Sequence, residues 1–195
     1  MKIDPNRLGF DIDGVVADTM HLFLDIARED FNLRDLRYED ITCYMLEECL
    51  NLEEKVIESI VVKLLDGSRD AGLRPIPGAP EVLERLGADH GPVRFVTARP
   101  DDEAIREWMH RIIPLPPSHL DIVATGSFEA KATVLREKGV SHFVEDRLET
   151  CFLLQDEGFT PILFKQPWNR EPHPFMEVKD WNELAALIDF PDRHS

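Results

Sequence analysis

The chain of 195 residues is long enough for one domain, or for one domain that carries a small insertion. It has 38 acidic and 22 basic residues, and its formal net charge of −16 argues against duplex nucleic acid or an anionic membrane as a partner. A small anionic substrate stays compatible, because a metal ion or a few local cations can reverse the charge inside one cleft.

The cysteines favour a reducing environment. Cys43, Cys49 and Cys151 include no CxxC pair, which excludes a zinc finger, and we interpret all three as structural thiols of a cytoplasmic protein. The N-terminal sequence MKIDPNRLGFDIDG lacks the apolar stretch of a signal peptide. No apolar run approaches the ~18 residues that a membrane span needs, so we expect no membrane partner.

Apolar residues follow strand-like runs and helical spacing along most of the chain. Strands are predicted over residues 7–12, 93–97, 120–124, 142–144 and 161–164. Helices are predicted over residues 18–31, 52–65, 81–86, 101–113, 129–138, 148–157 and 181–188. This alternation is typical of the α/β class, and we predict a Rossmann-like parallel sheet with helices on both faces.

An all-helical stretch separates the first strand from the rest of the series. We predict that residues 19–73 form a small helical cap inserted after the first strand, and that residues 1–18 and 74–195 form the α/β core domain. A plain helical layer packed on the sheet is the alternative. The cap is favoured because the stretch is long for a crossover and lies beside the most acidic turn of the chain, DIDG.

Polar residues follow the predicted strands at the ends where a parallel sheet binds its ligands. They are Asp11 and Asp13 after the first strand, Thr97, Ala98 and Arg99 after the strand at 93–97, Lys131 after the strand at 120–124, and Glu145 and Asp146 after the strand at 142–144. Each one singly is more simply explained as a turn or helix-cap residue. Together they predict one crevice at one edge of the sheet.

Asp11 and Asp13 have the chemistry of phosphoryl transfer. One carboxylate can attack phosphorus as a covalent nucleophile while the other exchanges a proton with the leaving oxygen, if their environments separate their pKa values. Gly14 lets the backbone approach a phosphate. Together with Glu145 and Asp146 these carboxylates would repel an anionic substrate without a cation, and hard oxygen ligands suit Mg²⁺.

Four motifs, DIDGV, VTA, a lone lysine and an ED pair, occur in this order along the chain. They resemble the four motifs of the haloacid dehalogenase superfamily of phosphohydrolases, and the resemblance covers the whole chain. Within that superfamily, DIDGVVAD, VTARP, EDR and QPWNR (residues 166–170) are similar to the 5′(3′)-deoxyribonucleotidase branch and its bacterial relatives.

The resemblance implies a role for each matching residue. Asp11 would be the nucleophile, and Asp13 would be the general acid and then the base, with its backbone carbonyl on the metal. Asp146 would be the third protein ligand of Mg²⁺, with Glu145 positioning it or a water molecule. The phosphoryl group would be bound by the residues of the second and third motifs, Thr97, Ala98, Arg99 and Lys131.

Two positions depart from the family pattern. Glu145 stands where an aspartate is usual. A glutamate is compatible with this position if the residue positions other groups and does not bind the metal itself. Thr19 stands where the nucleotidases commonly have an aromatic residue that can stack on a base, and this weakens the case for a nucleobase pocket.

Arg99 has a second interpretation, an ion pair with a neighbouring acid such as Asp101. Core packing is the simpler interpretation for four cap residues, Phe23, Tyr38, Tyr44 and Met45.

The sequence therefore predicts a Mg²⁺-dependent phosphomonoesterase, a hydrolase that works through an aspartyl phosphate, with a (deoxy)nucleoside monophosphate as the leading substrate. Another small phosphorylated metabolite, or phosphotransfer to an alcohol at the same site, is the alternative. A catalytically silent binding module is disfavoured because Asp11, Asp13 and Lys131 are all present. The oligomeric state, a homodimer included, stays open.

Overall fold

A computed structural model describes residues 2–191. Its strands are β1 (Leu8–Phe10), β2 (Val93–Thr97), β3 (Leu120–Ala124), β4 (His142–Glu145), β5 (Thr160–Phe164) and β6 (Met176–Val178). They form one sheet in the order β3-β2-β1-β4-β5-β6, and every neighbouring pair is parallel. The α/β class and the parallel sheet predicted from the sequence are confirmed.

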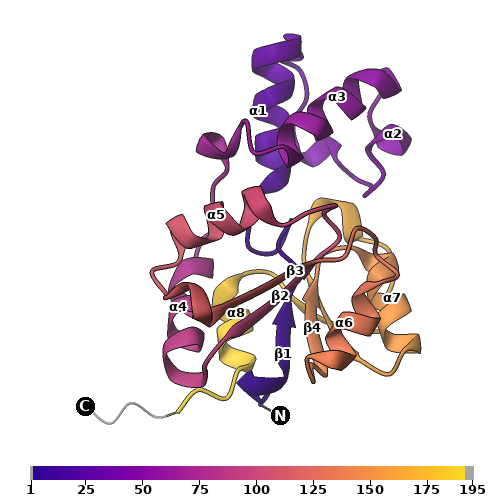
Figure 1. Cartoon of the computed structure of the whole chain (residues 1–195). Coiled ribbons are helices and arrows are strands. Elements are labelled where there is room, and N and C mark those ends of the chain that lie inside the picture. The colour runs from indigo at the N-terminus through magenta and orange to yellow at the C-terminus, as the bar shows by residue number, and fades with distance from the viewer. Residues whose placement is uncertain (1, 192–195) are drawn as a thin grey trace.

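Helices cover both faces of this sheet (Figure 1). Those of the α/β layers are α4 (Ala79–His90), α5 (Glu103–Ile112), α6 (Lys131–Glu137), α7 (Leu148–Asp156) and α8 (Trp181–Leu187). Helices α4, α5 and α8 lie on one face, and α6 and α7 lie on the other. This arrangement follows from right-handed crossovers that run outward from β1 in both directions.

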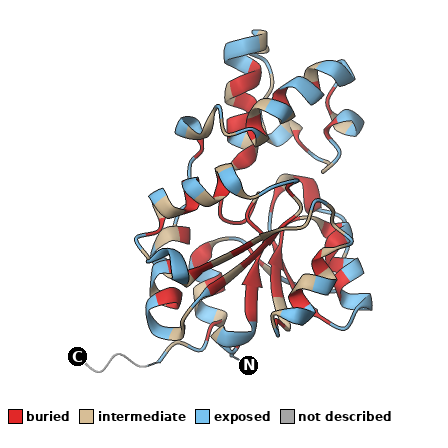
Figure 2. Ribbon diagram, viewed as in Figure 1, coloured by how far each residue is buried: buried red, intermediate tan, exposed pale blue. Residues whose placement is uncertain are grey.

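The strands are mainly apolar, as expected of strands covered on both faces, with polar residues such as Arg94 in β2 and Asp121 in β3. In β1 all three residues are buried. The ring of Phe10 stacks on that of Trp181 in α8, with centroids 5.5 Å apart, whereas Phe143 of β4 packs in a separate cluster with Leu135 of α6. Figure 2 shows the result, a buried sheet between helices whose outer faces are exposed.

Several elements differ from their predicted form. Helix α4 spans Ala79–His90 instead of residues 81–86, and it continues through Gly87, which packs so closely that a Cβ there would be 2.2 Å from Leu115. The short helix at Leu46–Cys49 was not predicted. Strand β6 was not predicted, since three residues after a proline-containing loop carry no periodic signal.

The segment after β1 forms a group of helices at the carboxyl edge of the sheet (Figure 1). It contains α1 (Thr19–Phe31), α2 (Leu46–Cys49) and α3 (Glu54–Leu65). Two connecting peptides join it to the sheet layers and pair with each other, since Asp18 N donates to Arg74 O at 2.9 Å and Ile76 N donates to Val16 O at 2.8 Å. These peptides lie at the boundaries predicted for the cap of residues 19–73, and the division into cap and core remains a prediction.

The prediction of three free thiols is wrong for two of them. Cys43 and Cys49 form a disulfide whose Cα atoms are 5.9 Å apart, and it closes a loop that contains α2. Cys151 is a free, buried thiol. The spacing of six residues gave no signal for this pairing, because the distance between the two Cα atoms depends on how the loop folds. Among residues 2–191, no helix combines the length and the apolar character that crossing a membrane requires.

Candidate active site

The predicted crevice lies where β1 and β4 are neighbours. The two strands run side by side, and Asp11 N donates to Val144 O at 2.8 Å. The carboxyl end of β1 therefore lies beside that of β4, at the point where the strand order changes direction. Asp11 follows one strand, and Glu145 and Asp146 end the other. The three residues are each at most 3 % exposed.

Lys131 brings the third motif into this cluster. It begins α6, is fully buried, and its Nζ lies 3.1 Å from Asp11 Oδ1 and 2.8 Å from Glu145 Oε2. Burial alone would lower the pKa of the ammonium group, but the two carboxylates outweigh that effect and raise this pKa above its ordinary value. Lys131 is thus a permanent positive charge beside Asp11.

The acidic cluster retains an excess of negative charge. Asp11, Glu145 and Asp146 each place a carboxylate oxygen within 4.8 Å of the others. Burial raises the pKa of Asp11 well above its ordinary value and Lys131 offsets part of that rise, whereas burial and repulsion by Glu145 and Asp11 together raise the pKa of Asp146. One cation among three carboxylates leaves an electrostatic cost that a divalent ion would remove.

The donor set fits a hard divalent cation through two of the three carboxylates. Within residues 2–191, Oδ1 of Asp146 is buried and has no hydrogen-bond partner. Both oxygens of Glu145 are already engaged, since Oε1 accepts from the backbone N–H groups of Asp146 and Arg147 and Oε2 accepts from Lys131. Asp11 and Asp146 are therefore the side chains free to bind Mg²⁺, and Glu145 orients its neighbours.

Gly14 keeps the space beside Asp146 open. Its φ is +70°, in the left-handed region, and a Cβ at this position would lie 2.0 Å from Asp146 Oδ2. No other residue type fits here without moving that carboxylate. The glycine of the DIDG turn thus allows the backbone conformation of the turn and also leaves room for the carboxylate of Asp146.

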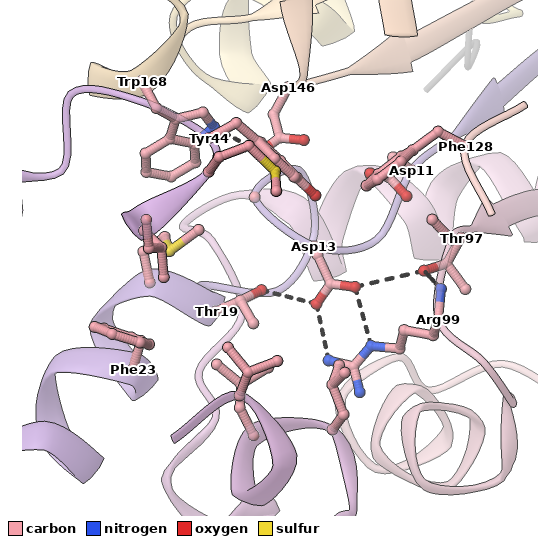
Figure 3. A pocket seen from close by; sticks show the side chains of 18 of the residues that line it. Asp11, Asp13, Thr19, Phe23, Tyr44, Thr97, Arg99, Phe128, Asp146 and Trp168 are labelled. Atoms are coloured by element: carbon pink, nitrogen blue, oxygen red, sulfur yellow. Dashed lines mark hydrogen bonds and ion pairs between the residues drawn. The ribbon is translucent and has the colours of Figure 1, made fainter. Parts of the chain in front are cut away.

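Asp13 faces away from this cluster and is held by the second motif (Figure 3). Arg99 donates Nε to Oδ2 at 3.0 Å and Nη2 to Oδ1 at 2.8 Å, and the Thr19 hydroxyl donates to Oδ1 at 2.9 Å. The Thr97 hydroxyl lies 3.4 Å from Oδ2. Burial alone would raise the pKa of Asp13, but the charge and hydrogen bonds of Arg99 outweigh it and lower this pKa below its ordinary value.

A cavity of about 330 Å³ opens over these groups. One part of its lining comes from residues at or just after the strand ends and is mostly polar, with Asp11, Asp13, Thr97, Ala98, Arg99 and Asp146. Its other walls are mainly apolar and come from the inserted segment, with Phe23, Tyr44 and Met45, and from two loops, with Phe128 and Trp168. The cavity therefore combines a charged end with an apolar end.

The structure places most of the predicted site residues together and adds others. Thr97, Ala98 and Arg99 border the cavity, but Arg99 pairs with Asp13, not with Asp101. Tyr44 and Met45 line the cavity although core packing was the simpler interpretation. Phe128 was missed, and it contacts Tyr44 edge-on with ring centroids 5.6 Å apart. It lies in an irregular loop, where no pattern separates a wall residue from a surface residue.

Known proteins resemble this chain in sequence and in fold. The family model described as "5' nucleotidase, deoxy (Pyrimidine), cytosolic type C protein" matches residues 6–193. The 5'(3')-deoxyribonucleotidase of Bacillus subtilis (strain 168) is 24% identical over 188 residues, which cover 93% of this chain and 97% of that protein.

Solved structures show the same fold at low identity. CbbY from Rhodobacter sphaeroides, in complex with phosphate, has a TM-score of 0.61 and 18% identity, and the match covers 94% of this chain and 96% of that chain. A putative haloacid dehalogenase-like hydrolase from Bacteroides fragilis has a TM-score of 0.64 and 12% identity, with 94% and 100% covered.

Proposed function

Because the chain belongs to the family of 5' nucleotidase, deoxy (Pyrimidine), cytosolic type C proteins and is a phosphatase of the haloacid dehalogenase type, we propose that it is a Mg²⁺-dependent nucleotidase. It would hydrolyse a (deoxy)nucleoside monophosphate through an aspartyl phosphate on Asp11. The single observation that carries this proposal is the contact of the buried Lys131 Nζ with Asp11, 3.1 Å apart, because Asp11 itself lines the cavity.

Asp11 is the nucleophile in this proposal. Its carboxylate attacks phosphorus, the bond from phosphorus to the leaving oxygen breaks, and the proton that the leaving oxygen takes up comes from Asp13. Lys131 favours the ionised form of Asp11 and attracts the phosphoryl oxygens. Asp11, Asp146 and the backbone carbonyl of Asp13 would hold Mg²⁺, which would supply charge stabilisation for the transferring phosphoryl group.

Asp13 is the acid and then the base. After the alcohol has left, Asp13 takes a proton from water, the water oxygen attacks phosphorus, and inorganic phosphate leaves as Asp11 is restored. The low pKa that Arg99 gives Asp13 suits the resting, ionised state. Substrate phosphate would compete with Asp13 for Arg99, and this release would let Asp13 hold a proton for the first step.

The shape of the cavity supports a nucleoside as the leaving group. Aromatic side chains line its apolar end although Thr19 lacks a ring, since Phe23, Tyr44, Phe128 and Trp168 are all part of the wall. Flat apolar surfaces suit a nucleobase. A different small phosphorylated metabolite, or transfer of the phosphoryl group to an alcohol, would use the same charged end.

A panel of phosphate esters tests the proposal. With Mg²⁺ present, we expect release of phosphate from deoxynucleoside and nucleoside monophosphates in preference to sugar phosphates, and no release with Asp11→Asn. Turnover by Asp11→Asn at the parent rate would reject the nucleophile assignment. Preference for sugar phosphates would reject the nucleotide, and formation of a new phosphate ester with added glycerol would indicate phosphotransfer. A cytoplasmic location belongs to the same proposal, and cell fractionation tests it.

A further inference from the structure

The residues Gln166 to Asn169, here called the 166–169 segment, lie beside the site, with Trp168 lining the cavity, although they belong to none of the four motifs. They follow β5 and include the short 3-10 helix η5 (Pro167–Asn169). Gln166, Trp168 and Asn169 are all buried. Their polar atoms bind groups on three separate parts of the molecule, namely the loop after β4, the turn after β1 and the inserted segment.

Toward the loop after β4, the 166–169 segment fixes Asp146 at two points. The indole N–H of Trp168 donates to Asp146 Oδ2 at 2.9 Å, and Asn169 Nδ2 donates to the backbone carbonyl of Asp146 at 2.7 Å. One carboxylate oxygen is thereby held by a neutral donor, and the other, Oδ1, has no hydrogen-bond partner among the described residues. The orientation of the carboxylate is thus set by Trp168.

Toward the turn after β1 and the inserted segment, Gln166 uses both ends of its amide. Its Nε2 donates to the carbonyl of Gly14 at 2.6 Å, and its Oε1 accepts from the hydroxyl of Tyr38 at 2.8 Å. Tyr38 lies in η2 (Tyr38–Asp40), between α1 and α2, and its ring also meets Trp168 edge-on, with centroids 5.9 Å apart. Burial raises the pKa of Tyr38, so its hydroxyl keeps the proton that it donates.

We propose that the 166–169 segment is a positioning element, in which Trp168 presents Asp146 Oδ1 to the divalent cation and Gln166 ties the inserted helices to the same point through Tyr38. This inference rests on the proposed function, because it takes Asp146 as a ligand of the ion. Groups that orient a ligating carboxylate typically change metal affinity by 10–100-fold when they are removed.

Metal binding without substrate tests the role of Trp168. The full chain is stripped with EDTA and titrated calorimetrically with MgCl₂. We expect Trp168→Phe to weaken Mg²⁺ binding by about tenfold or more. The matched control is Trp108→Phe, which also removes a buried indole N–H, but one that donates to Leu73 O at 3.0 Å. Its Mg²⁺ affinity should equal that of the parent. Parent affinity in Trp168→Phe, or an equal loss in both variants, would overturn the role of Trp168.

A measurement on the parent protein remains decisive if Trp168→Phe does not fold. In a ¹⁵N–¹H NMR spectrum, the indole N–H signal of Trp168 should shift on Mg²⁺ addition, because its acceptor is the carboxylate that binds the ion. The signals of Trp108 and Trp181, whose acceptors are the carbonyls of Leu73 and Val15, should stay. An unmoved Trp168 signal in a protein that binds Mg²⁺ contradicts the inference, whereas a parent protein that binds no Mg²⁺ defeats the proposed function itself.

Kinetics test the tie through Gln166. Tyr38→Phe removes one hydrogen bond and keeps the ring, so we expect KM for thymidine 5′-monophosphate to rise about fivefold with kcat within about twofold. In a Gln166→Met background, Tyr38→Phe should have no further effect, because both changes delete the same bond. Independent effects of the two changes, or a loss confined to kcat, would refute the proposed link between Gln166 and the inserted helices through Tyr38.

Discussion

Arg99 binds Asp13 through two nitrogen atoms at once, with Nε 3.0 Å from Oδ2 and Nη2 2.8 Å from Oδ1. Arg99 is 4 % exposed, so water screens this ion pair only weakly. Asp13 occupies Nε and one N–H of Nη2, and neither contact uses Nη1. Arg99 therefore acts on the resting enzyme through Asp13, and a bound phosphate that took over Nε or Nη2 would displace one of these contacts.

The first prediction concerns the charge of Arg99. Arg99→Gln removes the main influence that lowers the pKa of Asp13, so this pKa rises, and the limb of the kcat–pH profile that Asp13 governs moves to higher pH. We also expect kcat to fall by at least about tenfold. The control is Arg94→Gln, because Arg94 donates to Asn6 O at 2.9 Å, outside the site. An unshifted profile in Arg99→Gln would show that this ion pair does not set the protonation of Asp13.

The second prediction concerns Lys131 and stability. Lys131→Met leaves Asp11 and Glu145 buried without their cation, and breaking a buried pair in this way typically costs about 3–5 kcal/mol. We expect a loss of unfolding free energy of that size in urea, together with loss of phosphatase activity. Adding Glu145→Gln should restore part of the stability and none of the activity. A Lys131→Met protein as stable as the parent would contradict the argument.

The third prediction concerns how the stability of the folded chain depends on pH when the metal is removed. Asp11 and Asp146 have raised pKa values in the folded, metal-free chain, so the folded state binds more protons than the unfolded state. Their contribution to stability is therefore complete below the ordinary carboxylate pKa and declines as pH rises toward the raised values. In EDTA we expect this contribution to be smaller at pH 7.5 than at pH 5.5, and Mg²⁺ to raise Tm more at pH 7.5.

Asp146→Asn is the matched variant for that experiment. It removes one of the clustered charges, so Tm in EDTA at pH 7.5 should be equal to or higher than that of the parent, while the Mg²⁺-dependent rise disappears. Scanning fluorimetry with and without Mg²⁺ measures both effects. A full Mg²⁺ response in Asp146→Asn would place the ion elsewhere.

The fourth prediction concerns the disulfide between Cys43 and Cys49, which encloses the cavity residues Tyr44 and Met45. Closing a loop of this size contributes about 2 kcal/mol through the entropy of the unfolded chain. We expect dithiothreitol to lower Tm and to raise KM, because the enclosed wall residues lose their constraint. The double variant Cys43→Ser/Cys49→Ser should start at the reduced values and not respond to the reductant. Identical behaviour of parent and variant would mean that the bond does not form in solution.

Regular elements and the groups that follow them could be predicted from the sequence. Strand β2 was predicted residue for residue, and Asp11 and Lys131 were assigned to one pocket although 120 positions separate them, because parallel strands bring their carboxyl ends together. Their contact in the structure agrees with that reasoning. The physical basis is periodicity, which reports burial at every second residue or every turn of a helix.

Contacts between irregular segments could not be predicted in this way. The bond from Trp168 to Asp146 and the bond from Tyr38 to Gln166 join loops whose backbone paths depend on the whole fold. The hydrogen bond from the Thr19 hydroxyl to Asp13 could not be predicted either. The sequence indicated only that position 19 lacks the aromatic residue common in the nucleotidases. Such hydrogen bonds depend on three-dimensional neighbours and leave no periodic signal.

The central position of β1 has a consequence for synthesis of the protein on the ribosome. Gly9 pairs with Arg94 on one side and with Phe143 on the other, so the first strand to be made obtains its second neighbour only after β4 has been made. A nascent chain that has not yet exposed Phe143 leaves one edge of β1 open, and it also lacks Glu145 and Asp146. The acidic cluster of Asp11, Glu145 and Asp146 is therefore complete only after β4 and the residue that follows it have been made.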